Sequence, residues 1–284
     1  MTGTALSPAI VADLYRAACL AELDALKVGN VHAYAGGHRM EVADFVTSAE
    51  VSAPHLARAG ASVGARVRGG VEATISAVGQ NTNLGILLLC APIALASETA
   101  GRLQQRMSAV LSALDERDGA DVFAAIRHAN PGGLGTAQRH DVTEASTSVA
   151  LGAAMAEAAP RDRIARAYVT GFEDVFSVGL PALDAARRLD LSTNWATTAI
   201  HLAFLTSIPD SHIARKYGAE TAEKVRQEAA GALGGIDLRR EPVDVLLAHD
   251  RVLKEAGLNP GTSADFTVAT LFADTILTAR GEAR

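Results

Sequence analysis

Apolar residues recur at steps of three and four positions along almost the whole chain. Within 7–26, for example, Ile10, Leu14, Ala18 and Ala21 fall on one face of a helix. This spacing predicts amphipathic α-helices. Strands would instead need runs in which β-branched or aromatic residues alternate with polar ones, and no convincing run of that kind occurs. The pattern therefore predicts an all-α protein.

The same spacing sets the expected extent of each helix. Segments with helical spacing run over about 7–26, 41–59, 62–78, 84–99, 101–115, 119–128, 143–159, 162–176, 180–190, 194–206, 213–233, 241–256 and 264–280. If some neighbours merge, they make roughly ten to twelve helices. The chain shows neither a clear internal repeat nor a low-complexity linker that would divide it. We therefore predict a single domain over residues 1–284, with the helices packed around a central polar cleft.

The composition fits one large core. The chain has 284 residues, of which 49% are hydrophobic, and a formal net charge of −6. This mild acidity argues against nucleic-acid binding, because no basic stripe is available to neutralise phosphates. Individual Lys and Arg residues remain available for a small phosphorylated substrate. Cys19 and Cys90 lack metal-site spacing, so we expect buried, reduced thiols.

The most apolar segment is LGILLLCAPIALA at 84–96. It is shorter than the ~20 residues that a membrane-spanning helix needs, so a buried core helix is expected. The start MTGTALSPAI has no basic stretch followed by an apolar one, so no signal peptide is visible. We expect a cytoplasmic protein without a membrane partner. The Ala- and Gly-rich helices leave both a monomer and a homodimer open.

Five polar stretches interrupt the helical pattern. They read KVGNVHAYAGGH at 27–38, NTNLG at 81–85, NPGGLG at 130–135, SIPDSHIAR at 207–215 and NPGTSAD at 259–265. Each is either a plain connection between helices or one wall of a shared site. The residues themselves support both alternatives.

In the first stretch, Gly29 and Asn30 suit a left-handed helix ending followed by a surface connection. The functional alternative is an anion site. Glycines let backbone N–H groups approach an anion, and Lys27 adds a positive charge. Glu22, on the preceding helix, could point toward the same place.

The second stretch precedes the most apolar helix, and Thr82 or Asn83 would cap that helix. A helix N-terminus is also a ready anion site, because its free N–H groups and the helix dipole favour negative charge. The third stretch lacks the GK[ST] ending of a P-loop and follows no strand. It is equally a plain connection or a mobile loop that folds over a ligand, with the polar and flexible residues Gly132, Gly133, Gly135, Arg139 and Asp141.

The last two stretches each carry an aspartate near a helix start. Thr262 or Ser263 would cap one helix, and Asp265 in its first turn would either favour the helix dipole or bind Mg²⁺ as a hard oxygen ligand. Asp210 is either a simple N-cap or a second carboxylate for the same metal. His212 and Arg215 follow it within one turn.

Taken in order, these segments resemble the triphosphoribosyl-dephospho-CoA synthase family. The family pattern has a Glu before a KPG turn that ends in Gly-x-His, an NTHKG-like turn, a Gly-Phe…Leu-Pro segment, an Asp-Thr-Asn motif and a C-terminal NLSPGGSAD motif. The matching residues are Glu22, Lys27, Gly29, His38, Asn81, Thr82, Gly85, Gly171–Phe172, Leu180–Pro181, Asp210 and Ser211, and then Asn259, Pro260, Gly261, Ser263, Ala264 and Asp265. The resemblance spans roughly residues 20–275, and its last motif is the most specific.

The resemblance implies an all-helical fold and an unusual transfer reaction. ATP loses adenine, and a ribose hydroxyl of dephospho-CoA takes its place at C1′ of the triphosphoribosyl group. It implies a Mg²⁺ ion on Asp210 and Asp265, with Glu22, Asp210 and Asp265 as catalytic carboxylates, one of them the general base. From the resemblance and from the polar stretches themselves together, the predicted substrate-binding residues are Lys27, Gly29, His38, Asn81, Thr82, Asn83, Gly85, Gly132, Gly133, Gly135, Arg139, Asp141, His212, Arg215, Asn259, Gly261 and Ser263.

The chain also departs from the family pattern. Asn83 and Leu84 stand where the NTHKG turn has His and Lys, so a cation for the triphosphate is missing there. His32 replaces an acidic residue, and His212 replaces the Asn of Asp-Thr-Asn. The 130–141 segment looks like a feature of a divergent branch in methanogens and C1-metabolising bacteria. Two alternatives follow: a related transferase that acts on a phosphorylated or pyrophosphorylated intermediate of methanofuran or tetrahydromethanopterin biosynthesis, and a non-catalytic nucleotide-binding helical protein.

Overall fold

The computed structural model describes residues 3–33, 41–131 and 149–282, and within them it contains α-helices but no β-strand. The all-α prediction is confirmed. Fourteen α-helices occur in the described segments: α1 Pro8–Asp24, α2 Val42–Leu56, α3 Val63–Val78, α4 Leu84–Ser97, α5 Leu103–Ser112, α6 Glu116–Ala129, α7 Leu151–Ala158, α8 Arg163–Thr170, α9 Leu180–Arg188, α10 Thr193–Ser207, α11 Ser211–Tyr217, α12 Ala219–Leu233, α13 Val243–Glu255 and α14 Gly261–Ala279. A π-helical turn, Val175–Gly179, precedes α9, and a 3₁₀ turn, Leu238–Arg240, precedes α13.

Glycines explain two differences from the expected helix boundaries. The helix predicted over 213–233 is two helices, because Gly218 adopts φ +92° between α11 and α12. The helix predicted over 162–176 ends at Thr170, where Gly171 adopts φ +65° and caps α8 through its backbone N–H. A residue with a Cβ rarely adopts such angles, so the chain turns at these glycines.

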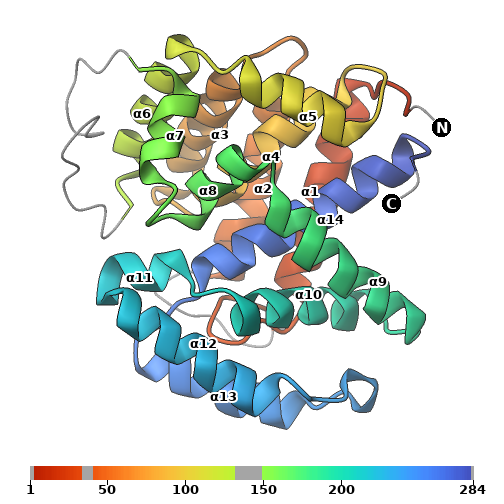
Figure 1. The fold of residues 1–284 in the computed structure, drawn as a ribbon, viewed down its shortest axis with the longest axis vertical. Helices are drawn as coiled ribbons and strands as arrows, with labels where there is room; N and C mark the ends of the chain where they lie inside the picture. The colour runs from red at the N-terminus through yellow and green to blue at the C-terminus, as the bar shows by residue number, and fades with distance from the viewer. Residues whose placement is uncertain (1–2, 34–40, 132–148, 283–284) are drawn as a thin grey trace.

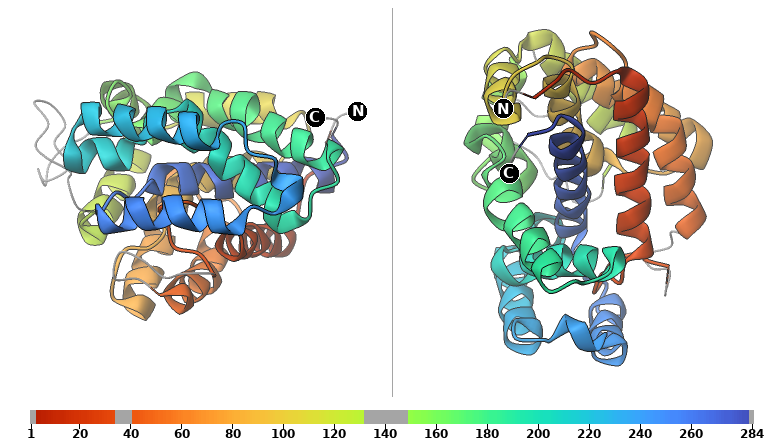
Figure 2. Two further views of the ribbon diagram at one scale, coloured as in Figure 1. Left: turned by 90° about the horizontal axis from the view of Figure 1, so that it is seen from below. Right: turned by 90° about the vertical axis from the view of Figure 1, so that its right-hand side faces the viewer.

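Helices α4 and α14 form the centre of the molecule. Nearly every residue of α4 is buried, as its uniformly apolar sequence predicts, and α14 is buried along most of its length. Helix α14 packs against α1, α4 and α10. Figure 2 shows α14 in dark blue, enclosed between α1 and the segment that contains α8 and α9. The other helices wrap this pair, so most of the polar groups on α4 and α14 are buried.

A second, smaller hydrophobic cluster joins the last third of the chain to this centre. Trp195 and Leu205 of α10 pack there with apolar residues of α12 and α13. Helices α11, α12 and α13 lie together at one end of the molecule in Figure 1. Leu26 and Val28, from the connection after α1, also belong to this cluster. The connection after α1 is therefore held in place by apolar packing against the second cluster.

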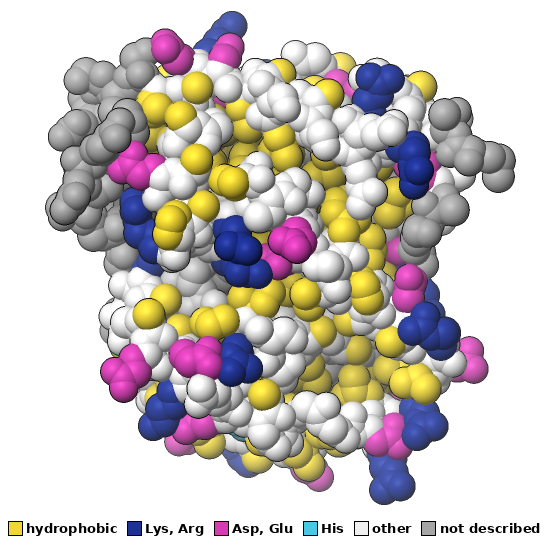
Figure 3. All heavy atoms as spheres, in the orientation of Figure 1, with side chains coloured by type: hydrophobic (Ala, Val, Ile, Leu, Met, Phe, Trp, Pro, Cys, Tyr) yellow, Lys and Arg dark blue, Asp and Glu magenta, His cyan; other side chains and the backbone are white. Residues whose placement is uncertain are grey.

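No helix in the described segments combines the length and the apolarity that crossing a bilayer requires. On the face of the molecule in Figure 3, basic and acidic side chains are interspersed, without a continuous stripe of one sign.

The contact between α3 and α6 depends on a buried aspartate. Asp118 accepts a hydrogen bond from the Gly64 backbone N–H at 2.7 Å and closes a capping box with Asp115 at the start of α6. A Cβ on Gly64 would lie 2.6 Å from the Asp118 carbonyl oxygen, so the two helices approach closely here. We expect Asp118→Ala to lower the free energy of unfolding by about 1–3 kcal/mol, because it leaves a buried N–H without an acceptor.

Asp121 provides a matched control on the same helix. Its carboxylate pairs with Arg68, whose side chain is half exposed, so Asp121→Ala should cost only about 0–1 kcal/mol. Urea denaturation of both variants measures the difference. Equal losses of stability would contradict the role given to Asp118.

Candidate active site

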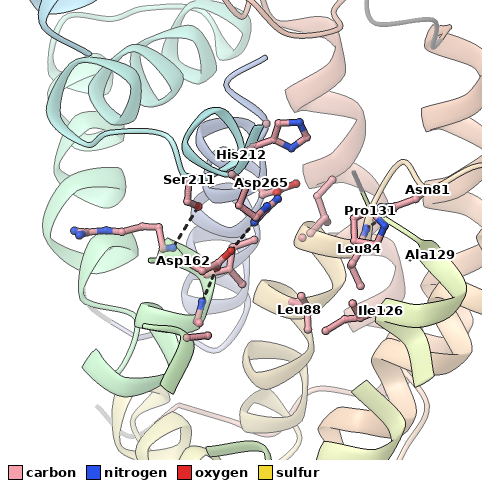
Figure 4. Close-up of a pocket in the computed structure, with 18 of the residues that line it drawn as sticks. Asn81, Leu84, Leu88, Ile126, Ala129, Pro131, Asp162, Ser211, His212 and Asp265 are labelled. Atoms are coloured by element: carbon pink, nitrogen blue, oxygen red, sulfur yellow. Dashed lines mark hydrogen bonds and ion pairs between the residues drawn. The ribbon is translucent and has the colours of Figure 1, made fainter. Parts of the chain in front are cut away.

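The described parts of the five polar interruptions all contribute residues to one large cleft. The described residues enclose a cavity of about 1320 Å³, lined mainly by α4, α6, α7, α8, α11 and the start of α14. In Figure 4, Asp162, Ser211, His212 and Asp265 lie on one side of this cleft, and Asn81 lies on the other. These residues come from positions that are far apart in the sequence.

Asp265 projects into the cleft from the buried helix α14, one turn after the helix begins at Gly261. Its neighbours Ala264 and Phe266 are buried. Within the described part of the chain, no hydrogen bond or ion pair holds the Asp265 carboxylate. Gly85 of α4 lies directly against it, and a Cβ at position 85 would overlap the carboxylate. A glycine is therefore required there for Asp265 to keep this position.

The surroundings of Asp265 disfavour its charge. Burial raises the pKa of Asp265 well above its ordinary value, and the nearby carboxylates of Asp210 and Glu22 raise it further. Arg215 acts in the opposite direction. A carboxylate kept in such a place without a partner is a feature of functional sites rather than of stable cores.

Asp210 has very different surroundings. Its side chain caps α11 by accepting hydrogen bonds from the backbone N–H groups of His212 at 2.9 Å and Ile213 at 3.2 Å. Its second oxygen accepts from the Ser263 backbone N–H at 2.8 Å and the Ser263 hydroxyl at 2.9 Å. Burial raises the pKa of Asp210, and these hydrogen bonds partly offset that rise. One carboxylate thus ties the starts of α11 and α14 together.

A buried ion pair lies at the edge of the cleft. Lys27 Nζ contacts the carboxylate of Glu22, which lines the cleft, and donates to Asn30 Oδ1 at 3.1 Å. Asn30 in turn donates to Asn259 Oδ1 at 2.8 Å, so the first and last polar stretches are joined by side chains. Burial raises the pKa of Glu22 and lowers the pKa of Lys27, while their mutual attraction opposes both shifts.

The turn that carries Lys27 is anchored to α13. Gly29 adopts φ +81°, and its N–H donates to Asp250 Oδ1 at 2.8 Å. A Cβ on Gly29 would lie 2.7 Å from Leu253 and 2.8 Å from Pro260, so only glycine fits. His32 Nε2 is 3.4 Å from the same Asp250 oxygen. An acidic residue at position 32 would face Asp250, which gives a physical reason for the histidine.

The NTNLG turn at 81–85 caps α4 differently from the expectation. Asn81 Oδ1 accepts from the Leu84 N–H at 3.1 Å, whereas neither Thr82 nor Asn83 caps the helix with its side chain. Instead, the Thr82 hydroxyl forms a hydrogen bond with the Ser48 hydroxyl of α2 at 2.6 Å, and the Asn83 side-chain amide donates to the Ser52 hydroxyl of the same helix at 3.2 Å. The prediction that a polar side chain of this turn caps α4 was correct. The residue that does so is Asn81, because the side chains of Thr82 and Asn83 form hydrogen bonds with helix α2 instead.

An arginine faces the acidic side of the cleft. Arg215 Nη1 donates to Asp162 Oδ2 at 2.5 Å, and Asp162 also caps α8 by accepting from the Ala165 N–H at 3.0 Å. The Arg215 Nε atom is buried, and none of the described residues forms a hydrogen bond with it. His212 packs against Gly261, where a Cβ would lie 3.1 Å from its ring. Arg215 and His212 are therefore cleft groups on one helix, α11.

The structure brings most of the predicted site residues to this cleft. Those on its walls are Glu22, Asn81, Thr82, Gly85, His212, Arg215, Asn259, Gly261 and Asp265. Those among the contacts that support the walls are Lys27, Gly29, Asn83, Asp210 and Ser263. The remaining ones, His38, Gly132, Gly133, Gly135, Arg139 and Asp141, lie outside the described residues. The catalytic and binding roles of all of these residues stay predictions.

The family model of ATP:dephospho-CoA triphosphoribosyl transferase, CitG, matches residues 8–283. The chain belongs to the CitG family. Membership makes it a transferase of the triphosphoribosyl-dephospho-CoA synthase type and removes the non-catalytic alternative. The resemblance read from Glu22, the NTNLG turn and the NPGTSAD motif is confirmed.

A solved structure supports the fold of this CitG-family chain. It is a crystal structure from Archaeoglobus fulgidus that bears the name triphosphoribosyl-dephospho-CoA synthase, with 22% sequence identity and a TM-score of 0.62. The similarity covers 83% of this chain and 99% of the archaeal one. At this identity it establishes the shared fold alone. No curated protein matches the chain.

The two carboxylates that were expected to hold Mg²⁺ differ in their fitness for it. The hydrogen bonds to Asp210 engage both of its oxygens twice, which uses all of their lone pairs. Asp265 keeps its lone pairs available and would gain from a nearby cation. In the described segments no cluster of three or more His, Cys, Asp or Glu side chains is arranged as a metal site. Mg²⁺ needs no such cluster, because one or two carboxylates together with substrate phosphates suffice.

Three residues of this site escaped the sequence reasoning: Asn30, Asp162 and Asp250. Asn30 was read only as a helix-ending residue, although its place beside Lys27 was a usable signal. Asp162 was simply the first residue of an expected helix. Asp250 had no sequence signal at all, because its contact with Gly29 joins positions 221 residues apart.

Replacing Asp265 tests its electrostatic environment. A group whose pKa is raised by folding contributes stability that is fully present below its unfolded pKa and is lost as the pH rises through its folded pKa. Asp265→Asn removes this titration. We expect the metal-free variant to be more stable than the wild type, by a margin that grows as the pH rises above the ordinary Asp range of about 4.

Thermal unfolding between pH 4 and 8 with a chelator present measures this margin. Asp274→Asn is the matched control, because Asp274 accepts two hydrogen bonds from Arg187, at 2.9 and 2.6 Å. That variant should be less stable than the wild type at neutral pH. If Asp265→Asn lost as much stability as Asp274→Asn, Asp265 would be a structural residue whose carboxylate has a stabilising partner.

Proposed function

We propose that this CitG-family transferase transfers the triphosphoribosyl group of ATP to a ribose hydroxyl of dephospho-CoA and releases adenine. The observation that carries this assignment is the Asp265 carboxylate, held on the buried helix α14 without a partner among the described residues and facing the cleft. A partly buried carboxylate without a partner suits a reaction in which positive charge develops on the substrate, because that charge would stabilise its ionised form.

The reaction replaces one bond at C1′ with another. The glycosidic C–N bond breaks as adenine leaves, the acceptor oxygen bonds to C1′, and the hydroxyl proton passes to a base. Substitution at an anomeric carbon proceeds through an oxocarbenium-like centre. Asp265 and Glu22 both line the cleft and would stabilise that positive charge electrostatically.

Glu22 is the better candidate for the general base. Its carboxylate is reachable from the cleft and its pKa is raised by burial, toward the range in which a base works efficiently near neutral pH. Lys27 sits on the other side of the carboxylate and would hold it in position while it accepts the proton. Asn30 and Asn259 fix the orientation of this pair through their hydrogen bonds.

Asp265 would hold a Mg²⁺ ion together with phosphate oxygens of the substrate. When bound, the ion would neutralise charge on the triphosphate and orient it. Asp210 would not contact the ion itself. It would position Asp265 indirectly, because its hydrogen bonds to Ser263 fix the start of α14. Arg215 and Lys216 of α11 and Arg166 of α8 line the cleft and supply positive charge for phosphates.

A related transfer in the biosynthesis of a C1-carrier cofactor is the second candidate. The observation that favours it is Leu84, which puts an apolar side chain at the start of α4, where a triphosphate grip would use a cation. In that reaction the same polar residues would act on a phosphorylated or pyrophosphorylated intermediate of methanofuran or tetrahydromethanopterin biosynthesis. ATP would then not be the donor.

Adenine release distinguishes these candidates. The purified protein is incubated with Mg²⁺, ATP and dephospho-CoA, and free adenine is measured by chromatography and mass spectrometry. We expect adenine only when dephospho-CoA is present, and a loss of about a hundredfold or more in Asp265→Asn with the fold preserved. Asp121→Asn, with its partly exposed carboxylate on α6, is the matched control. Mg²⁺-dependent ATP binding without adenine would favour the second candidate instead.

The pH dependence of kcat/KM tests Glu22 as the base. A base must be deprotonated, so kcat/KM should rise with pH through the pKa of Glu22, above the ordinary Glu range. Glu22→Gln should lose this rise and reduce kcat/KM by about 10²–10⁴-fold. If the variant keeps the wild-type pH profile and only raises KM, Glu22 binds substrate and another group takes the proton.

A further inference from the structure

The cleft has a second wall of a different character. Apolar side chains from α4, α6 and α7 line it: Leu84, Leu88, Val122, Ile126, Leu151 and Met155, of which Val122 and Leu151 are fully buried and the other four keep some exposed surface. We call this wall and the space against it the apolar compartment. In Figure 4, Leu84, Leu88 and Ile126 lie opposite Asp162 and Asp265. One cavity therefore joins a charged wall to an apolar one.

The two walls meet at the start of α4. Gly85 touches the Asp265 carboxylate, while the side chain of its neighbour Leu84 lines the cavity. The first turn of a helix favours negative charge, so an anion-binding site would present a polar side chain at position 84. The Leu84 side chain offers a phosphate neither a positive charge nor a hydrogen bond, so a charged group that contacts it loses hydration without gaining a partner there.

Positive charge is found on the other side of the cavity. Arg166 of α8 and Lys216 of α11 line the cleft and are solvent-exposed, and within the described segments neither forms an ion pair with an acidic residue. Arg215 of α11 lines the cleft as well. A ligand that contacts both walls of the cavity favourably therefore has a phosphate at one end and an uncharged, apolar part at the other.

We propose that the apolar compartment binds an uncharged ring or chain of a phosphorylated substrate, and so selects substrates by apolar contact on the side where Leu84 stands. The placement of the phosphate end rests on the proposed function. The apolar end rests only on the six side chains of the compartment. Their contact with a ring would add affinity roughly in proportion to the apolar area removed from water, on the order of 25 cal/mol per Å².

Binding of 1-naphthyl phosphate tests the compartment without requiring turnover. This fluorescent probe joins a fused apolar ring to one phosphate, and its affinity is compared with that of inorganic phosphate measured by competition. We expect the full-length protein to bind the probe at least about tenfold more tightly than inorganic phosphate. Leu84→Lys should abolish that preference and leave the affinity for inorganic phosphate equal or higher.

Two further variants keep the result interpretable. Leu189→Lys introduces the same charge at a half-exposed leucine after α9, outside the cleft, and should bind the probe like the wild type. Ile126→Asn places a polar group in the compartment from α6 and should weaken probe binding even if Leu84→Lys does not fold. Thermal unfolding establishes which variants are folded.

The outcomes separate this inference from the proposed transfer reaction. Probe binding that Leu84→Lys and Ile126→Asn both weaken supports the compartment, whether or not adenine is released. If the probe binds no better than inorganic phosphate, or if folded variants bind it as the wild type does, the compartment is not a binding surface. Adenine release in that case would leave the transfer reaction standing and remove only the apolar selection.

Discussion

The geometry of the cleft depends on one carboxylate that is not itself on its surface. Asp210 accepts backbone hydrogen bonds from the starts of both α11 and α14, so two helix N-termini share a single buried negative charge. This arrangement satisfies donors that the helices leave open and is favoured by both helix dipoles. It positions His212 and Arg215 on one side and Asp265 on the other.

Around this anchor, the protein concentrates charges that a stable core would avoid. The Glu22–Lys27 pair is buried, and Asp265 is kept without a partner among the described residues. Burying such groups costs free energy, which α4 and α14 offset through their extensive apolar packing. The most hydrophobic helices of the chain therefore lie next to its most unfavourably placed charged groups, Glu22, Lys27 and Asp265.

The polar wall of the cleft is held together without the side chain of residue 84. The contacts that hold its polar wall involve Asp210, Ser263, Asn30 and Asn259, and none of them involves the side chain of residue 84. A leucine can therefore stand at that position without disturbing the carboxylates opposite. The hydrogen bonds that hold the polar wall and the side chain of Leu84 therefore involve different atoms.

The sequence by itself determined the all-helical class, most helix boundaries and the family, and it singled out several of the polar stretches that contribute to the cleft, because helical periodicity, caps and glycine turns are local properties. It also singled out Asp210 and Asp265, but it treated them as equivalent metal ligands. Only the tertiary structure decided that one is saturated by hydrogen bonds and the other is open, and that Asp250 holds the Gly29 turn. The reason is physical: the state of a carboxylate depends on burial and on partners up to 221 residues away along the chain, which no local pattern encodes.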